Sequence, residues 1–82
     1  MSREEVFERV QKRLLEILRD VKPEQLTMAV NLKEDLGVDS MFMLESTMAL
    51  EEEFEIEMLD DDLPRLNTLG DLTDYVLERM AA

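Results

Sequence analysis

Residues 36–54 read LGVDSMFMLESTMALEEEF, a glycine turn followed by an aspartate, a serine and a mostly apolar run that ends in acidic residues. Gly37 can supply a backbone with positive φ if the turn needs one. Asp39 or Ser40 suits the N-cap of a helix, because either side chain can accept a hydrogen bond from the first free N–H groups. The pattern predicts a helix from about Ser40 to Phe54, and the fold is built around it.

This predicted helix has two distinct faces at about 100° per residue. One face should pack into a core, and it consists of Met43, Thr47, Leu50 and Phe54. The opposite face alternates methionine with glutamate, as Met41, Glu45, Met48 and Glu52, with Phe42 and Ala49 on a flank between the faces. Methionines could simply fill gaps in a helix that is buried all round. The interleaved glutamates favour a docking surface instead, because a buried stripe would not carry an unpaired glutamate every other turn.

The remaining segments also read as helices. A first helix should run from about Arg3 to Val21, with Ser2 and Glu5 as a capping box, before Pro23 ends the pattern. A short helix of one or two turns should begin at residues 60–62 (three aspartates) and be limited by Pro64. A last helix should start after Thr68, with Asp71 as its box-like partner and a buried stripe of Leu69, Leu72, Val76 and Met80, flanked by Tyr75.

These segments predict an all-α fold, a small four-helix bundle with three longer helices and one short third helix, in a single domain over residues 1–82. The connection at residues 22–38 carries enough apolar residues that it should fold back onto the core. No segment shows the alternation that a strand requires.

Composition excludes several chemistries. The chain has no cysteine and no histidine, which removes disulfides, thiol nucleophiles and the commonest general base and metal ligand. We therefore expect no catalytic residue and no metal site. No apolar run is long enough to cross a bilayer, and the N-terminus does not resemble a signal peptide, so we expect a cytoplasmic protein.

The charge is concentrated in one part of the chain. The net charge is −12, and residues 34–64 contain twelve acidic residues and no lysine or arginine. Such a block disfavours nucleic acid and membranes as partners and favours basic protein surfaces, although it could serve only to keep the protein soluble. The three contiguous aspartates lack the spacing and central glycine of a calcium-binding EF-hand loop.

Ser40 has two interpretations from its own surroundings. Without histidine it cannot belong to a hydrolase triad, and residues 37–41 (GVDSM) do not form a nucleophile elbow. It could be the N-cap of the helix, or it could carry a phosphate-linked group, which the free N–H groups of a helix start would stabilise. The residues alone leave both interpretations open.

The segments DLGVDSM (residues 35–41) and MALEEEFEIEM (residues 48–58) resemble the acyl carrier protein family, and the resemblance covers about Leu32 to Leu77. It implies that Ser40, preceded by Asp39, carries covalent 4′-phosphopantetheine, whose thiol holds acyl groups as thioesters. It implies docking through Met41, Glu45, Met48, Glu51 and Glu52. The implied partners are a phosphopantetheinyl transferase and acyl-transferring or acyl-modifying enzymes with basic docking surfaces, and the carrier itself would be a non-catalytic monomer.

Three residues depart from the family pattern. Phe42 stands where an acidic residue is common, Ser46 where a leucine is usual, and Leu59 where a proline is frequent. These departures are compatible with a specialised carrier rather than the housekeeping carrier of fatty-acid synthesis. Two alternatives stay open: a peptidyl or aminoacyl carrier on the same fold, and a helical interaction module without a prosthetic group.

Overall fold

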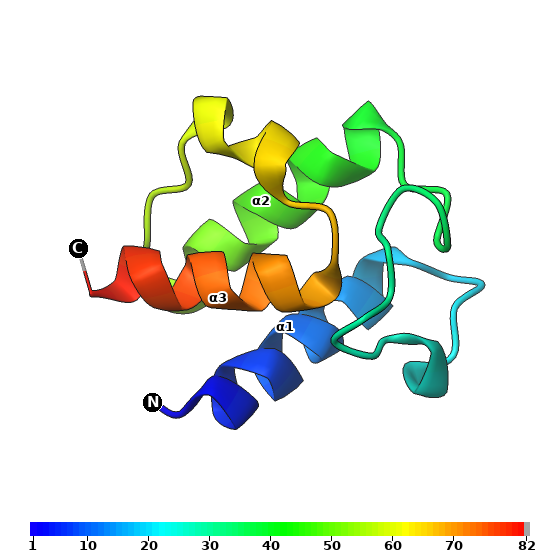
Figure 1. Cartoon of the computed structure of the whole chain (residues 1–82), viewed down its shortest axis with the longest axis horizontal. Helices are drawn as coiled ribbons and strands as arrows, with labels where there is room; N and C mark the ends of the chain where they lie inside the picture. Colours follow the sequence, from blue (N-terminus) through cyan, green and yellow to red (C-terminus); the bar gives the residue numbers. More distant parts are fainter. Residues whose placement is uncertain (82) are drawn as a thin grey trace.

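The fold is seen in a computed structural model that describes residues 1–81 (Figure 1). Its elements in chain order are α1 (Arg3–Ile17), η1 (Pro23–Gln25), α2 (Ser40–Phe54), η2 (Asp60–Arg65) and α3 (Leu69–Met80). Both η elements are short 3₁₀ helices, and η2 is the predicted short third helix, whereas η1 was not predicted. The all-α fold class with its four predicted helices is confirmed. The predicted domain ends at residue 82, which lies outside the described residues.

Helix α1 begins as predicted but ends earlier. Ser2 and Glu5 form the capping box, yet the helix stops at Ile17, so the predicted end at Val21 is wrong. Leu18 already has an extended backbone, with φ −90° and ψ 109°, and both Leu18 and Val21 remain partly buried against the core. Pro23 disfavours a helical backbone at the residue before it and cannot continue the helix itself, so it limits how far a helix can run without fixing where this one stops.

Helix α2 has the predicted bounds but a wider buried surface. Phe42, which we placed on a flank, is buried, and so is Ser46. The buried arc is wide because α1 and α3 both contact this helix. The hydroxyl of Ser46 is satisfied within the helix, where it donates to the carbonyl of Met43 at 3.1 Å.

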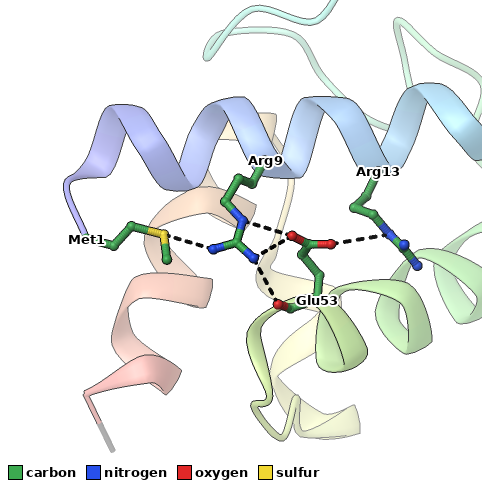
Figure 2. Close-up of polar contacts among 4 residues, drawn as sticks. All are labelled: Met1, Arg9, Arg13 and Glu53. Carbon is green, nitrogen blue, oxygen red and sulfur yellow. Dashed lines mark hydrogen bonds and ion pairs between the residues drawn. The ribbon is translucent and has the colours of Figure 1, made fainter.

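Two arginines of α1 hold the C-terminal end of α2 through Glu53 (Figure 2). Arg9 Nε donates to Glu53 Oε2 at 2.8 Å, and Arg9 Nη2 donates to the Glu53 carbonyl at 3.2 Å. The same guanidinium lies 4.9 Å from the centre of the Phe54 ring. Arg13 Nε is 4.0 Å from Glu53 Oε1. Glu53 therefore belongs to the acidic block in sequence but is already paired with cations in the structure.

The long connection between α1 and α2 packs against the start of α3, as expected from its apolar residues. Leu26 and Leu32 are fully buried. The first N–H groups of a helix have no partner within it, and here the connection supplies acceptors for two of them. The N–H of Leu69 donates to the carbonyl of Val30 at 3.0 Å, and that of Gly70 donates to the carbonyl of Met28 at 2.8 Å.

Helix α3 confirms its predicted start and most of its predicted stripe. Thr68 and Asp71 form a capping box. Tyr75, which we placed at the edge of the stripe, is only 4% exposed, whereas Met80 is only half-buried. Tyr75 can be buried because its hydroxyl finds two hydrogen-bond partners in the segment around η2.

Candidate functional site

Asp39, and not Ser40, caps helix α2. Asp39 has an extended backbone, with φ −99° and ψ −177°, and its carboxylate accepts the N–H of Phe42 at 2.8 Å. Ser40 is therefore the first residue inside the helix and is exposed. Among residues 1–81 its hydroxyl makes no hydrogen bond. The structure thus leaves the Ser40 hydroxyl available, which the sequence alone could not decide.

The start of α2 is also a favourable place for a phosphate. The N–H groups of Ser40 and Met41 lie in the first turn, where no acceptor exists within the helix. These groups and the positive end of the helix dipole stabilise an anion at this position. Gly37 has φ 63°, a left-handed conformation that turns the chain just before the cap, as the sequence suggested.

A groove of about 550 Å³ lies beside Ser40, between the start of α2 and η2. Five of its lining residues are apolar, and they are Val38, Met43, Leu44, Leu63 and Pro64. Lys33, Asp39 and Asp60 add charged groups to the lining. A volume of this size lies within the range of small-molecule sites. A flexible arm attached to Ser40 would therefore meet an apolar surface next to its point of attachment.

The groove was missed in the sequence because its walls come from distant segments. Lys33 belongs to the connection before α2, whereas Leu63 and Pro64 belong to η2.

The outward face of α2 lies as predicted. Met41 is 68% exposed and Met48 is 61% exposed, and Glu45 and Glu52 are exposed beside them. Leu44, for which we predicted neither face, is also 61% exposed. Around the helix Leu44 lies between Ser40 and Met48, so helical periodicity alone places it on the same face as Met48. Three apolar side chains and two carboxylates therefore share this face, which we call the outer face of α2.

Glu51 differs from the residues of the outer face of α2 because it makes an internal contact. Its side chain is half-buried, and its carboxylate accepts the N–H of Met58 at 3.0 Å. Glu51 thus holds the segment that follows α2, a structural contact that the resemblance did not suggest.

A hydrogen-bonded group connects η2 to α3. The Tyr75 hydroxyl donates to Asp62 Oδ2 at 2.7 Å and accepts the N–H of Leu59 at 3.0 Å. The hydrogen bond from Tyr75, and then the neighbouring Arg65, hold the pKa of Asp62 below its ordinary value. Burial is the main reason that the pKa of Tyr75 is raised.

Two further observations concern ions and membranes. Residues 1–81 contain no group of three histidine, cysteine, aspartate or glutamate side chains arranged to hold a metal ion. None of the helices in the same residues is both long and apolar enough to cross a membrane.

Comparison with known proteins shows to which family the chain belongs. Residues 8–76 match the family described as "Phosphopantetheine attachment site". The acyl carrier protein of Phenylobacterium zucineum (strain HLK1) is 42% identical over 78 residues, covering 95% of this chain and 98% of that protein. The acyl carrier protein of Caulobacter vibrioides (strain NA1000 / CB15N) is 40% identical over 77 residues, covering 94% and 97%. A solved structure of the acyl carrier protein from Enterococcus faecalis superposes with a TM-score of 0.78 at 35% identity, covering 96% of this chain and 99% of that one.

The fold and the family match, which spans well over half of the chain, define a carrier domain with a phosphopantetheine attachment site. Its relatives make the class more specific, and the chain belongs to the acyl carrier protein family. Its function is that of an acyl carrier, and its prosthetic group is 4′-phosphopantetheine. This family consists of carriers rather than catalysts, and its members interact with phosphopantetheinyl transferases and biosynthetic enzymes.

Proposed function

We propose that this chain carries acyl intermediates as thioesters on a 4′-phosphopantetheine arm attached through a phosphodiester to Ser40. It delivers them to partner enzymes of fatty-acid, lipid or polyketide-type biosynthesis. The observation that carries this proposal is the exposed Ser40 hydroxyl, which is free because Asp39 caps the helix in its place. The first-turn N–H groups and the adjacent groove fit a phosphate that continues into a flexible arm.

In this proposal the bound arm supplies the thiol that forms the thioester, and the protein itself makes and breaks no bonds. Asp39 fixes the first turn of α2 and so orients Ser40 for modification. The tether keeps the cargo at a high effective concentration near whichever partner active site the carrier is docked to.

We assign docking to the outer face of α2. Met41, Leu44 and Met48 supply an adaptable apolar contact, and Glu45 and Glu52 steer basic partner surfaces towards it. Glu51 adds negative charge at the edge of this face while its carboxylate holds Met58. Docking of this kind forms quickly and weakens with salt, which suits a carrier that must leave each partner.

We further propose that residues 1–82 act as one carrier domain, a monomer in the cytoplasm with no catalytic activity of its own. The net charge of −12 supports the monomer, because copies with this charge repel one another. A peptidyl or aminoacyl carrier and an interaction module without a prosthetic group are the competing functions.

Mass spectrometry after incubation with coenzyme A and a phosphopantetheinyl transferase tests the proposal. We expect the mass of exactly one phosphopantetheine to be added to the wild-type chain and to Ser2→Ala, and none to be added to Ser40→Ala. Circular dichroism shows whether each variant is folded. If several transferases leave the folded wild-type chain unmodified, the interaction module is the better function. If the chain is modified, the mass of the group that it carries in cells distinguishes acyl from aminoacyl cargo.

A further inference from the structure

The short helix η2 has few interactions of its own to hold it in place. It is a six-residue 3₁₀ helix with no side-chain cap and no fully buried residue. It begins with three aspartates that repel one another and contains Pro64. Such a segment has low intrinsic stability, so its position must depend on contacts with the rest of the molecule.

The contacts that fix the start of η2 converge on one buried tyrosine of α3. The Tyr75 hydroxyl donates to Asp62 Oδ2 at 2.7 Å, inside the first turn of η2. It also accepts the N–H of Leu59 at 3.0 Å, from the residue just before that turn. The hydrogen bond to the carboxylate is charge-assisted and is stronger than a neutral one. The ring of Tyr75 is anchored in the core, so the hydroxyl is a fixed point.

Two further contacts hold the chain just before η2. The Glu51 carboxylate accepts the N–H of Met58 at 3.0 Å, and Arg79 Nε donates to the Glu57 carbonyl at 2.7 Å. These contacts position residues 57–58, but they do not reach η2 itself. Tyr75 is therefore the residue of α3 whose side chain hydrogen-bonds to η2.

The position of η2 determines the groove beside Ser40. Its lining includes Asp60, Leu63 and Pro64 of η2, together with Ser40, Met43 and Leu44 of α2. Tyr75 does not line this groove and can influence it only by holding η2.

We propose that Tyr75 is a positioning residue whose hydroxyl latches η2 and thereby sets the space available beside Ser40 to the arm and its cargo. That this space holds cargo rests on the proposed function, whereas the latch itself is a property of the unmodified chain. When the latch opens, η2 moves away from α2 and the groove widens, so bulky cargo is accommodated by breaking two hydrogen bonds rather than by unfolding the core.

Tyr75→Phe tests the latch on the unmodified protein, because it keeps the buried ring and removes only the hydroxyl. We measure amide hydrogen exchange by NMR at Leu59, which donates to the hydroxyl, and at Asp62 and Leu66. The N–H groups of Asp62 and Leu66 donate to the carbonyls of Leu59 and Leu63, at the two ends of η2. We expect exchange at these three amides to rise by at least about fivefold, because that factor corresponds to losing one ordinary hydrogen bond and the hydroxyl makes two. Exchange in α1 should stay unchanged.

Thr73→Val is the matched control. Thr73 is also buried in α3, and its hydroxyl donates to the Leu69 carbonyl at 2.9 Å without reaching η2. Thr73→Val should leave hydrogen exchange at Leu59, Asp62 and Leu66 unchanged. Equal exchange in Tyr75→Phe and wild type, or the same increase in both variants, would overturn the latch.

A second measurement separates the latch from the proposed function. On modified protein loaded with acyl chains of increasing length, Tyr75→Phe should change how well the thioester is protected from hydroxylamine, and Thr73→Val should not. If Ser40 cannot be modified but exchange responds as expected, the latch stands and the carrier function fails. If Ser40 is modified but exchange does not respond, the carrier function stands and the latch fails.

Discussion

At Gly70 the backbone of α3 touches the connection between α1 and α2. A Cβ atom there would lie 2.9 Å from the carbonyl oxygen of Met28, the same oxygen that accepts the Gly70 N–H at 2.8 Å. The close contact with the Met28 carbonyl requires a glycine at this position, whereas the φ angle of Gly70 does not. We therefore expect Gly70→Ala to lower the free energy of unfolding by about 1–2 kcal/mol, because overpacking outweighs the better helix propensity of alanine. Urea denaturation measures this change.

Gly37→Ala is the informative comparison for that prediction. At Gly37 a Cβ would meet nothing within 4 Å, but φ is 63°, so the substitution destabilises through the backbone by about 1–2 kcal/mol. Only Gly70→Ala should speed hydrogen exchange at the Leu69 amide in native conditions. A Gly70→Ala protein as stable as the wild type would show that the contact with Met28 is not tight.

At the scale of an element, the outer face of α2 predicts salt-dependent recognition. Reversing two charges with Glu45→Lys and Glu52→Lys should slow modification by a phosphopantetheinyl transferase about tenfold at low salt, because steering towards a basic partner surface is lost. The difference from wild type should shrink as salt screens the charges. Initial rates of modification, measured from about 20 mM to about 500 mM salt, test this salt dependence, because screening of exposed charges increases strongly over that range.

The control for this prediction carries the same change of net charge on another helix. Glu8→Lys and Glu16→Lys alter two exposed residues of α1 and should leave the rate close to that of wild type. If both double variants slow modification equally, net charge and not the outer face of α2 governs recognition.

At the scale of the whole molecule, two carboxylates make stability depend on acid pH. The pKa of Asp71 is lowered mainly by the N–H groups of Thr68 and Asn67, and that of Asp62 by the hydroxyl of Tyr75 and by Arg65. A carboxyl whose pKa is lowered by folding stabilises the protein above its ordinary pKa of about 4, and this stability is lost as pH falls through the lowered value. We therefore expect the free energy of unfolding to decrease below about pH 4.

Asp71→Asn isolates one of these contributions, since it keeps an acceptor for the cap and cannot titrate. Urea denaturation from pH 5 to pH 2, a window taken around the ordinary carboxyl pKa of about 4, should give a shallower loss of stability for this variant than for wild type. If the free energy of unfolding falls equally steeply with pH in Asp71→Asn and wild type, protonation of Asp71 in the cap of α3 does not cause the loss of stability in acid.

Much of the architecture follows from residues close together in sequence. The bounds of α2, the capping boxes at Ser2 and Thr68, and the outward position of Met41 and Met48 all follow from helical periodicity and cap chemistry. Such signals act over about one helical turn, so they need no knowledge of the fold. The DSM motif at residues 39–41 and the concentrated negative charge were equally visible, and they pointed to the carrier family that the comparisons confirm.

The sequence by itself therefore determined where the three α-helices begin, the candidate attachment serine and the acidic face. Only the tertiary structure decided that Asp39 caps α2 and leaves Ser40 free, that Glu51 and Glu53 are held in internal contacts, and that Phe42 is buried. It also placed η2 beside Ser40 and Tyr75 behind η2. These outcomes depend on which distant segments pack together, and packing is set by the shape and volume of the whole core rather than by any local pattern.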